Sequence, residues 1–247
     1  MAEKLAFGVE PSRRAYRVRL ARYVALADAV AAHVRTVGDA RPGPLRLLDV
    51  GVGTGRAVRY IEAAGVADRL ELIGIDVATD RLVFPERWIL VRGDIEKGLP
   101  FADDSFDVVT CEQVLEHVHD PARLVAEMDR ILRPGGLLVV GTPMFPPGLA
   151  FIRKHIVPPA YRLFGIESTH IQAFSVRSLA KTVRRQERLN LCKTRGFRIV
   201  SGGILGLLED SRWWWRLNPF IGRLAPGICT EAQIIAIKQQ QRTDPIT

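Results

Sequence analysis

The chain has 247 residues, of which 47% are hydrophobic, and this suffices for a substantial core and excludes a largely disordered protein. No apolar stretch approaches the roughly 18 residues needed to cross a bilayer, so we do not expect a membrane-spanning helix. Lys and Arg number 35 against 27 Asp and Glu, and the resulting charge of +8 suits nucleic acid or an anionic membrane, unless these residues only cover solvated helix faces.

The predicted elements begin with a helix at 12–37, where apolar residues recur at helical spacing until Gly38. Short apolar runs then alternate with helix-like stretches. Strands are expected at 45–50, 70–76, 88–94, 106–111 and 137–142, with helices at 56–64 and 120–132. Asp120 and Pro121 are typical of a helix start, and Pro134-Gly135-Gly136 is expected to end the second of these helices.

From Pro143 onward the alternation is interrupted by two segments that mix apolar, aromatic and basic residues. In chain order we expect an insertion at 143–174, a helix at 175–190, a strand at 197–205, a second insertion at 206–231 and a strand at 233–239. Alternating strands and helices imply an α/β fold, in which a parallel sheet carries helices on both faces.

The sharpest local pattern is LLDVGVGTGR at 47–56, where a strand is followed by Gly51, Gly53 and Gly55 and then by a helix. Glycines let the main chain turn tightly and leave room for a ligand against the backbone. By itself this pattern is also compatible with an ordinary glycine-rich turn or with a dinucleotide-binding fold.

Two acidic residues stand at the ends of the next strands. Asp76 follows Gly55 by 21 residues, where a carboxylate can accept hydrogen bonds from both hydroxyls of a ribose. Asp94 ends the third predicted strand and could accept from an adenine amino group, while Ile95 covers the ring. Arg56 occupies the sixth position of the dinucleotide pattern, which disfavours NAD. The Tyr-x-x-x-Lys pair of short-chain oxidoreductases is also missing.

Taken in order, these motifs resemble those of the class I S-adenosylmethionine-dependent methyltransferases, and most closely the small-molecule type that includes ubiquinone and menaquinone biosynthesis enzymes. The resemblance covers about 45–143, with a weaker similarity at 170–179. The motifs are DVGVGTG, GID, GDIEKGLPFADDSFDVV, CEQVLEHV and LRPGGLLVVGTP.

The resemblance implies a doubly wound, mostly parallel seven-stranded sheet of Rossmann-like type in one domain spanning 1–247. It divides the chain into an N-terminal helical cap at 1–44, a cofactor-binding core at 45–142 and insertions near the acceptor site at 143–174 and 206–231. The residues implied to bind S-adenosylmethionine are Asp49, Gly51, Gly53, Gly55, Asp76, Asp94, Ile95, Cys111 and Glu112.

The implied chemistry is an in-line displacement at an activated methyl group, so alignment of the reactants does most of the work. A general base is needed only where the acceptor must lose a proton. Our first candidate for that base is His117 and our second is His170, although either could instead pack or cap a turn. Nothing in the sequence marks a metal site.

The acceptor is expected to be a small molecule, apolar or lipid-linked, because both insertions combine aromatic or aliphatic side chains with cations. The same composition suits peripheral contact with an anionic membrane, and it equally suits aromatic residues that only seal the insertion against the sheet. The region 177–195 is basic but lacks aromatic residues for base stacking, so a nucleic acid partner is disfavoured.

Three widely spaced cysteines indicate reduced thiols, and we expect a cytoplasmic protein, free or peripheral at the inner membrane face. Two alternatives keep the fold and change the function. One is an RNA or protein methyltransferase, and the other is a non-catalytic scaffold that still binds the cofactor.

Overall fold

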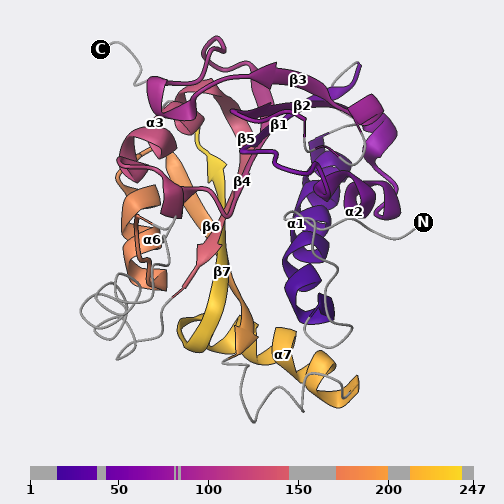
Figure 1. Ribbon diagram of the computed structural model, residues 1–247, viewed down its shortest axis with the longest axis vertical. Coiled ribbons are helices and arrows are strands. Elements are labelled where there is room, and N and C mark those ends of the chain that lie inside the picture. The colour runs from indigo at the N-terminus through magenta and orange to yellow at the C-terminus, as the bar shows by residue number, and fades with distance from the viewer. Residues whose placement is uncertain are drawn as a thin grey trace, which may run out of the picture.

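The computed structural model describes residues 16–37, 43–80, 82, 85–144, 171–199 and 212–240. Seven strands form one sheet with the order β3-β2-β1-β4-β5-β7-β6 (Figure 1). The strands are β1 (Leu45–Val50), β2 (Leu70–Asp76), β3 (Ile89–Arg92), β4 (Phe106–Glu112), β5 (Leu132–Pro143), β6 (Leu189–Ile199) and β7 (Cys229–Lys238).

Strands β1 to β5 are parallel to one another, whereas β7 pairs antiparallel with both β5 and β6. This arrangement confirms the mostly parallel seven-stranded sheet. The strand order reverses between β1 and β4, and in such open sheets ligands bind at the carboxyl ends of the strands near the reversal. Because β7 is antiparallel, its first residues and the last residues of β6 lie at the same edge.

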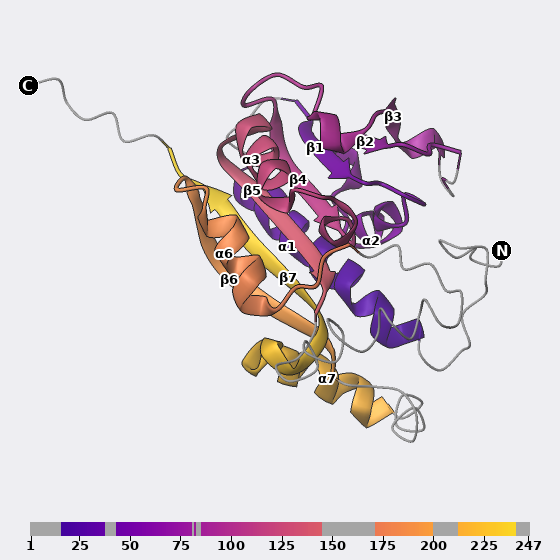
Figure 2. The same cartoon turned by 60° about the vertical axis from the view of Figure 1, so that its left-hand side comes forward.

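Helices cover both faces of the sheet, as Figures 1 and 2 show. Buried residues of α1 and α2 form one core cluster with the sheet, and those of α3 and α6 form the other. The α-helices are α1 (Tyr16–Val37), α2 (Ala57–Ala63), α3 (Pro121–Ile131), α6 (Val176–Arg184) and α7 (Arg212–Leu224). Short 3-10 turns are η2 (Ala67–Arg69), η3 (Pro85–Arg87), η4 (Ile95–Lys97), η5 (Leu115–His117) and η7 (Pro226–Ile228).

The first half of the chain follows the sequence prediction closely. Asp120 caps α3 by accepting a hydrogen bond from the Arg123 backbone N–H at 3.0 Å, with Pro121 as the first helical residue. The prediction that Pro134-Gly135-Gly136 separates helix from strand was wrong, because β5 already begins at Leu132. Leu132 pairs with Phe106, and a register shift before Val108 accommodates the turn-like residues within the strand.

The second half needs larger corrections. The predicted helix at 175–190 ends at Arg184, and the following strand begins at Leu189 rather than at 197. Leu189 pairs with Lys238 and Leu191 with Ala236, so pairing along β7 overrides the local helical pattern. Residues 200–205 of the predicted strand, residues 145–170 of the first insertion and the residues before Tyr16 lie outside the described residues.

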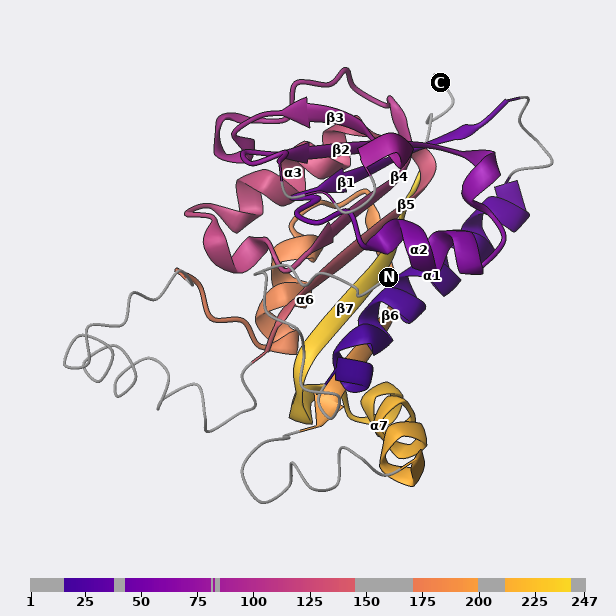
Figure 3. The same ribbon diagram turned by 45° about the vertical axis from the view of Figure 1, so that its right-hand side comes forward.

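The second insertion contains α7, which lies across the ends of β6 and β7 (Figure 3). Asn218 of α7 accepts a hydrogen bond from the Ile199 backbone N–H at 3.1 Å. A Cβ atom on Gly222 would overlap the Gly196 backbone, so the helix and the edge strand touch through two glycines. Among the described residues, no helix is both long enough and apolar enough to cross a membrane.

Candidate functional site

The glycine loop between β1 and α2 lies at the carboxyl edge of the sheet. Gly51, Gly53 and Gly55 all have positive φ, at 72°, 54° and 66°. A Cβ atom on Gly51 would overlap the Val114 side chain, whereas one on Gly53 would meet only the Gly51 carbonyl oxygen at 3.8 Å. Packing therefore requires glycine at 51, while the backbone conformation favours it at 53 and leaves that part of the loop open to a ligand.

Asp76, the last residue of β2, is fixed against this loop. One carboxylate oxygen accepts a hydrogen bond from the Gly53 backbone N–H at 2.9 Å, and the other accepts from the Ala78 N–H at 3.0 Å. The loop is tied to the same strand again, because the Gly51 N–H donates to the Ile75 carbonyl at 2.8 Å. An ionised carboxylate has about four acceptor positions, so Asp76 keeps acceptor capacity for a ligand.

Asp94 and Ile95 follow the neighbouring strand β3. Asp76 pairs with Arg92, and the Gly93 N–H donates to the Asp76 carbonyl at 3.0 Å, which brings the two strand ends together. The Asp94 carboxylate caps η4 by accepting from the Glu96 N–H at 3.1 Å. The structure thus places Asp76 and Asp94 at adjacent strand ends, as the sequence predicted.

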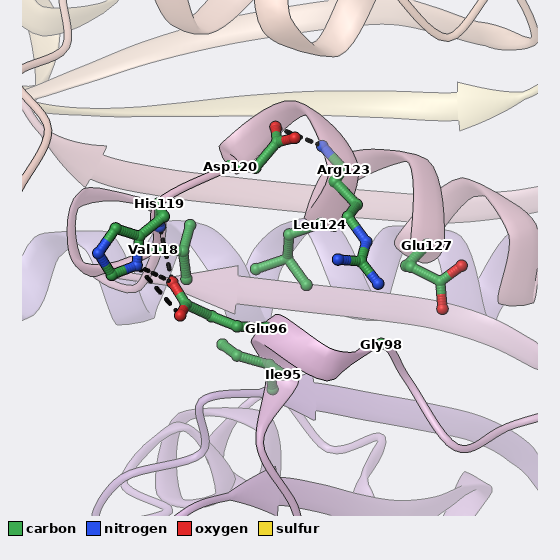
Figure 4. A pocket seen from close by; sticks show the side chains of 9 residues that line it. All are labelled: Ile95, Glu96, Gly98, Val118, His119, Asp120, Arg123, Leu124 and Glu127. Carbon is green, nitrogen blue, oxygen red and sulfur yellow. Dashed lines mark hydrogen bonds and ion pairs between the residues drawn. The ribbon is translucent and has the colours of Figure 1, made fainter.

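Ile95 borders a cavity of about 230 Å³ between η4 and α3 (Figure 4). Apolar side chains of Ile95, Val118 and Leu124 face this space, and Glu96 and His119 close one side of it. His119 is held there, because its Nδ1 lies 2.8 Å from a carboxylate oxygen of Glu96. Asp94 is not among the residues that line the cavity.

Asp49 is buried beneath the glycine loop on β1. Its carboxylate accepts a hydrogen bond from Thr110 Oγ1 at 2.8 Å. Burial raises the pKa of Asp49 to about 7, the Thr110 hydrogen bond opposes this rise, and the charge of Asp76 adds to it. A cationic group placed beside Asp49 would favour the ionised form, so the residue is suited to receive one.

The two residues at the end of β4 point to opposite faces of the sheet. The Cys111 side chain is fully buried in the core with Val50 and Leu115, and burial raises the pKa of its thiol far above the usual value. Glu112 faces α1, where one of its carboxylate oxygens accepts from Gln233 Nε2 at 2.9 Å. Cys111 is therefore closed to a ligand, whereas Glu112, which is partly exposed, can offer its side chain.

A charged cluster beside Glu112 was missed by the sequence analysis. Arg22 of α1 and Arg198 of β6 share the carboxylate of Glu231, each at 3.0 Å. Burial raises the pKa of Glu112 to about 8, and the charge of Arg22 and the Gln233 hydrogen bond oppose that rise. Two polar residues at alternate positions of a strand, Glu231 and Gln233, are the signal that could have revealed this cluster.

Three side-chain atoms of this charged cluster are buried and have no hydrogen-bond partner within the described residues, namely Arg22 Nε, Glu112 Oε2 and Gln233 Oε1. Opposite Glu112 on β5 stands Gly141, where any Cβ atom would overlap the Glu112 carboxylate. The cluster thus places one donor and two acceptors without partners beside the end of β4, between α1 and the sheet.

His117 lies in η5 with its side chain 38% exposed, and its Nε2 is 3.9 Å from a carboxylate oxygen of Glu116. Glu116 is buried and accepts a hydrogen bond from Thr142 Oγ1 at 3.0 Å, and burial raises its pKa. His170, our second candidate base, lies outside the described residues. Across the described ranges, no group of three or more His, Cys, Asp or Glu residues is arranged to hold a metal ion.

Comparison with known proteins shows which proteins this chain resembles. Residues 48–140, which run from β1 into β5, match the protein family described as "Methyltransferase domain". An uncharacterized methyltransferase of Mycolicibacterium vanbaalenii is 40% identical over 128 residues, covering 48% of this chain and 48% of the relative. The demethylmenaquinone methyltransferase of Renibacterium salmoninarum is 39% identical over 101 residues, covering 38% of this chain and 40% of the relative.

The chain therefore spans less than half the length of these two curated relatives. Among solved structures, a candidate methyltransferase from Bacillus halodurans superposes with a TM-score of 0.59 at 20% identity, covering 88% of this chain and 99% of that one. That likeness extends the common fold beyond the matched segment, to nearly the whole chain.

Proposed function

We propose that this chain, a member of the class I S-adenosylmethionine-dependent methyltransferases, transfers the methyl group of that cofactor to a small-molecule acceptor. The observation that carries the proposal is the carboxylate of Asp76 fixed against an open glycine loop at the strand-order reversal. A ribose diol at this carboxylate would lie beside the Gly53 backbone, where no side chain occupies the space.

The remaining residues of the edge fit the other parts of the cofactor. Asp94 would accept from the adenine amino group, and Ile95 would cover the ring beside the apolar cavity. Asp49, whose pKa burial raises to about 7, suits the cationic amino group at the opposite end. Glu112 would border the methionine part, and the fully buried Cys111 would lie behind it.

When bound, the cofactor supplies a methyl group that its sulfonium already activates. The chain then has to align the acceptor, exclude water and, for some acceptors, remove a proton. We propose His117 for that proton, because its side chain is partly exposed at the carboxyl edge beside buried Glu116. His119 is the weaker candidate, since Glu96 already holds its ring. His170 stays a second prediction for the base.

Titration calorimetry with S-adenosylmethionine and its demethylated product tests the cofactor assignment. Asp76→Ala removes two loop hydrogen bonds and the ribose acceptor, so we expect at least tenfold weaker binding, about 1.4 kcal/mol. Glu71→Ala, at the opposite end of β2, removes an exposed pairing with Arg46 and is the matched control. Failure of the unaltered chain to bind either nucleoside would overturn the proposal.

The finer part of the proposal concerns the acceptor, which we infer to be apolar or lipid-linked. One relative is named for demethylmenaquinone, and α7 exposes Trp213, Phe220 and Leu224 at the same edge of the sheet as the candidate site. Aromatic and aliphatic side chains on an arginine-rich helix suit peripheral contact with an anionic membrane.

Incubation of cell extract with methyl-labelled cofactor identifies the acceptor class. We expect label in the organic-soluble fraction, and none there with Asp76→Ala. Label confined to protein or nucleic acid would replace the small-molecule assignment by a macromolecular one. Tight cofactor binding with no label in any fraction would favour a non-catalytic scaffold.

A further inference from the structure

A second cavity lies away from the candidate cofactor site, between the first half of α1, the end of β6 and α7. Its volume is about 240 Å³, and it has no lining residue in common with the glycine loop or the ends of β2 to β4. Figure 3 shows α7 beside the lower ends of α1 and β6, at one end of the sheet. Val24, Phe197 and Pro219 form apolar walls, while Arg195, Asn218 and Arg223 bring polar groups.

Two of the polar side chains carry buried donors that have no partner within the described residues. Asn218 is only 2% exposed, and its Oδ1 accepts from the Ile199 N–H while its Nδ2 has no acceptor. Arg195 donates from one terminal nitrogen to the Ala25 carbonyl at 2.9 Å, but its buried Nε has no acceptor. An unpaired buried donor destabilises the folded state, because it loses its hydrogen bonds to water without replacing them, so the pair calls for an explanation.

Positive charge also exceeds negative charge around this cavity. Burial lowers the pKa of Arg195, and the charge of Arg223 lowers it further, while Asp28 opposes both. Arg198, the third arginine of the lining, is already paired with Glu231, which it shares with Arg22. Arg195 and Arg223 also line the cavity, and Asp28 is the one acidic residue among its described lining residues.

We propose that this cavity binds a phosphate group carried by an apolar molecule. The guanidinium groups of Arg195 and Arg223, which both line the cavity, would pair with the phosphate oxygens, and Asn218 Nδ2, which is closed to solvent, would donate to them after its side chain turns toward the ligand. Charge-assisted donors of this kind recognise phosphate strongly. Val24, Phe197 and Pro219 would contact the carbon skeleton next to the phosphate. The ligand is either a soluble phosphorylated compound or the headgroup of a phospholipid.

The close contact between Gly222 and Gly196 explains how the donors are held in place. It lets α7 lie directly on β6, so that Asn218 is buried against the strand and Arg223 follows five residues later on the same helix. The apolar residues Trp213, Phe220 and Leu224 remain exposed on the same helix. A phospholipid headgroup in the cavity would leave these side chains free to enter the surrounding lipid.

Binding of inorganic phosphate to the full chain tests the site without any methyl transfer. Phosphate is titrated against the protein by calorimetry and thermal unfolding, at ionic strength held constant with chloride. We expect saturable binding that raises Tm, and at least tenfold weaker binding in Arg223→Ala. Arg184→Ala removes an exposed arginine from the last turn of α6 and should leave phosphate binding unchanged.

Asn218→Asp separates an anion site from a merely structural asparagine. The new carboxylate can still accept from the Ile199 N–H, but it replaces the free donor by a negative charge beside Arg195. We expect this variant to fold, to be as stable as the unaltered chain without phosphate, and to lose its response to phosphate. Equal phosphate responses in the unaltered chain, Asn218→Asp and Arg223→Ala would show an adventitious ion only and overturn the proposal.

The two sources of the phosphate are distinguished by presenting it on vesicles. Phosphatidylcholine vesicles containing about one fifth phosphatidic acid are compared with glycerol phosphate in solution. Vesicle binding that Asn218→Asp weakens at least tenfold assigns the cavity to a lipid headgroup. Asn218-dependent binding of glycerol phosphate, with vesicle binding unaffected, assigns it to a soluble ligand. Absence of saturable binding to phosphate, glycerol phosphate and vesicles rejects the site.

Discussion

The glycine-loop edge and a second region, formed by α1, the end of β4, β6, β7 and α7, both place polar side chains at the carboxyl end of the parallel strands. They hold these side chains in different ways. At the glycine loop, Asp76 and Asp94 accept from backbone N–H groups a few residues along the chain or on the adjoining loop. In the second region the polar atoms come from five elements that are distant in the sequence, namely α1, β4, β6, α7 and β7. Five of these atoms are buried without a hydrogen-bond partner among the described residues: Arg22 Nε, Glu112 Oε2, Arg195 Nε, Asn218 Nδ2 and Gln233 Oε1.

The difference shows which of the two regions is held in place by its own backbone hydrogen bonds. The glycine-loop edge is preorganised by its own backbone, and it coincides with the segment 48–140 that matches the methyltransferase family. The second region is held by tertiary contacts, and its residues other than Glu112 lie outside that segment. It keeps donors and acceptors that have no partner among the described residues. We therefore expect the first region to be intolerant of backbone changes and the second to respond to pH and ligands.

The largest expected effect is at the glycine loop. Gly51 and Gly65 share a φ of 72°, but only at Gly51 would a Cβ atom overlap another side chain, that of Val114. Gly65→Ala should cost about 1 kcal/mol of unfolding free energy from backbone strain alone. Gly51→Ala should cost a further 1–3 kcal/mol from overpacking and should abolish cofactor binding, as measured by denaturant unfolding and calorimetry.

The double variant Gly51→Ala with Val114→Ala is the internal check on this prediction. Removing the Val114 methyl groups should recover part of the lost stability, because it relieves the overlap and leaves only the strain at φ 72°. Equal destabilisation by Gly51→Ala and Gly65→Ala would contradict the prediction, because it would mean that Val114 moves aside at no cost in free energy.

A smaller loss is expected for the proposed base. His117→Gln should lower kcat about 100-fold or more for an acceptor that must lose a proton, because general-base catalysis contributes on this scale. His119→Gln is the matched control for the rate, since Glu96 already holds that ring. Cofactor binding by His117→Gln should stay unchanged in calorimetry. Equal rates for His117→Gln and the unaltered chain would move the search to His170.

Glu112 should make the second region sensitive to pH. Burial raises the pKa of Glu112 from 4.5 to about 8, so the folded protein retains a proton that the unfolded chain has released in this range. The associated stability is present below pH 4.5 and is lost as the pH rises through about 8.

Glu112→Gln cannot ionise, so its Tm should exceed that of the unaltered chain at alkaline pH and match it in mild acid. Thermal unfolding across this pH range measures the difference. A smaller slope should persist in the variant, because burial also raises the pKa of Asp49, to about 7. Identical pH profiles for the two proteins would show that Glu112 stays ionised in the folded state.

The smallest expected effect concerns α7. Trp213 and Phe220 are 56% and 57% exposed, so changing both to Ser should alter the unfolding free energy by no more than about 0.5 kcal/mol. Binding to anionic vesicles, measured by co-sedimentation, should nevertheless fall several-fold. Ile89→Ser, at a 53% exposed position on edge strand β3, is the control that should bind as before. Vesicle binding that is lost equally in all three positions would argue for a nonspecific apolar effect.

The sequence alone was sufficient for the sheet from β1 to β4 and for the glycine loop between Asp49 and Asp76. Each of these features depends on residues near one another in the chain: an apolar run, a glycine that permits positive φ, an acidic residue at a strand end. Local rules of backbone conformation and periodicity are therefore enough to predict these features. The positions of Asp76 and Asp94 at strand ends followed in the same way, whereas the sheet order made those two ends neighbours.

Tertiary structure alone decided the rest. Leu189 and Asn190 became strand because β7 lay beside them, and Leu132 began β5 early because Phe106 offered it a partner. Arg22 meets Glu231 across 209 positions of sequence. No sequence periodicity predicts such a pairing, because the distance and burial of the two charged groups are determined only when α1 packs against β7.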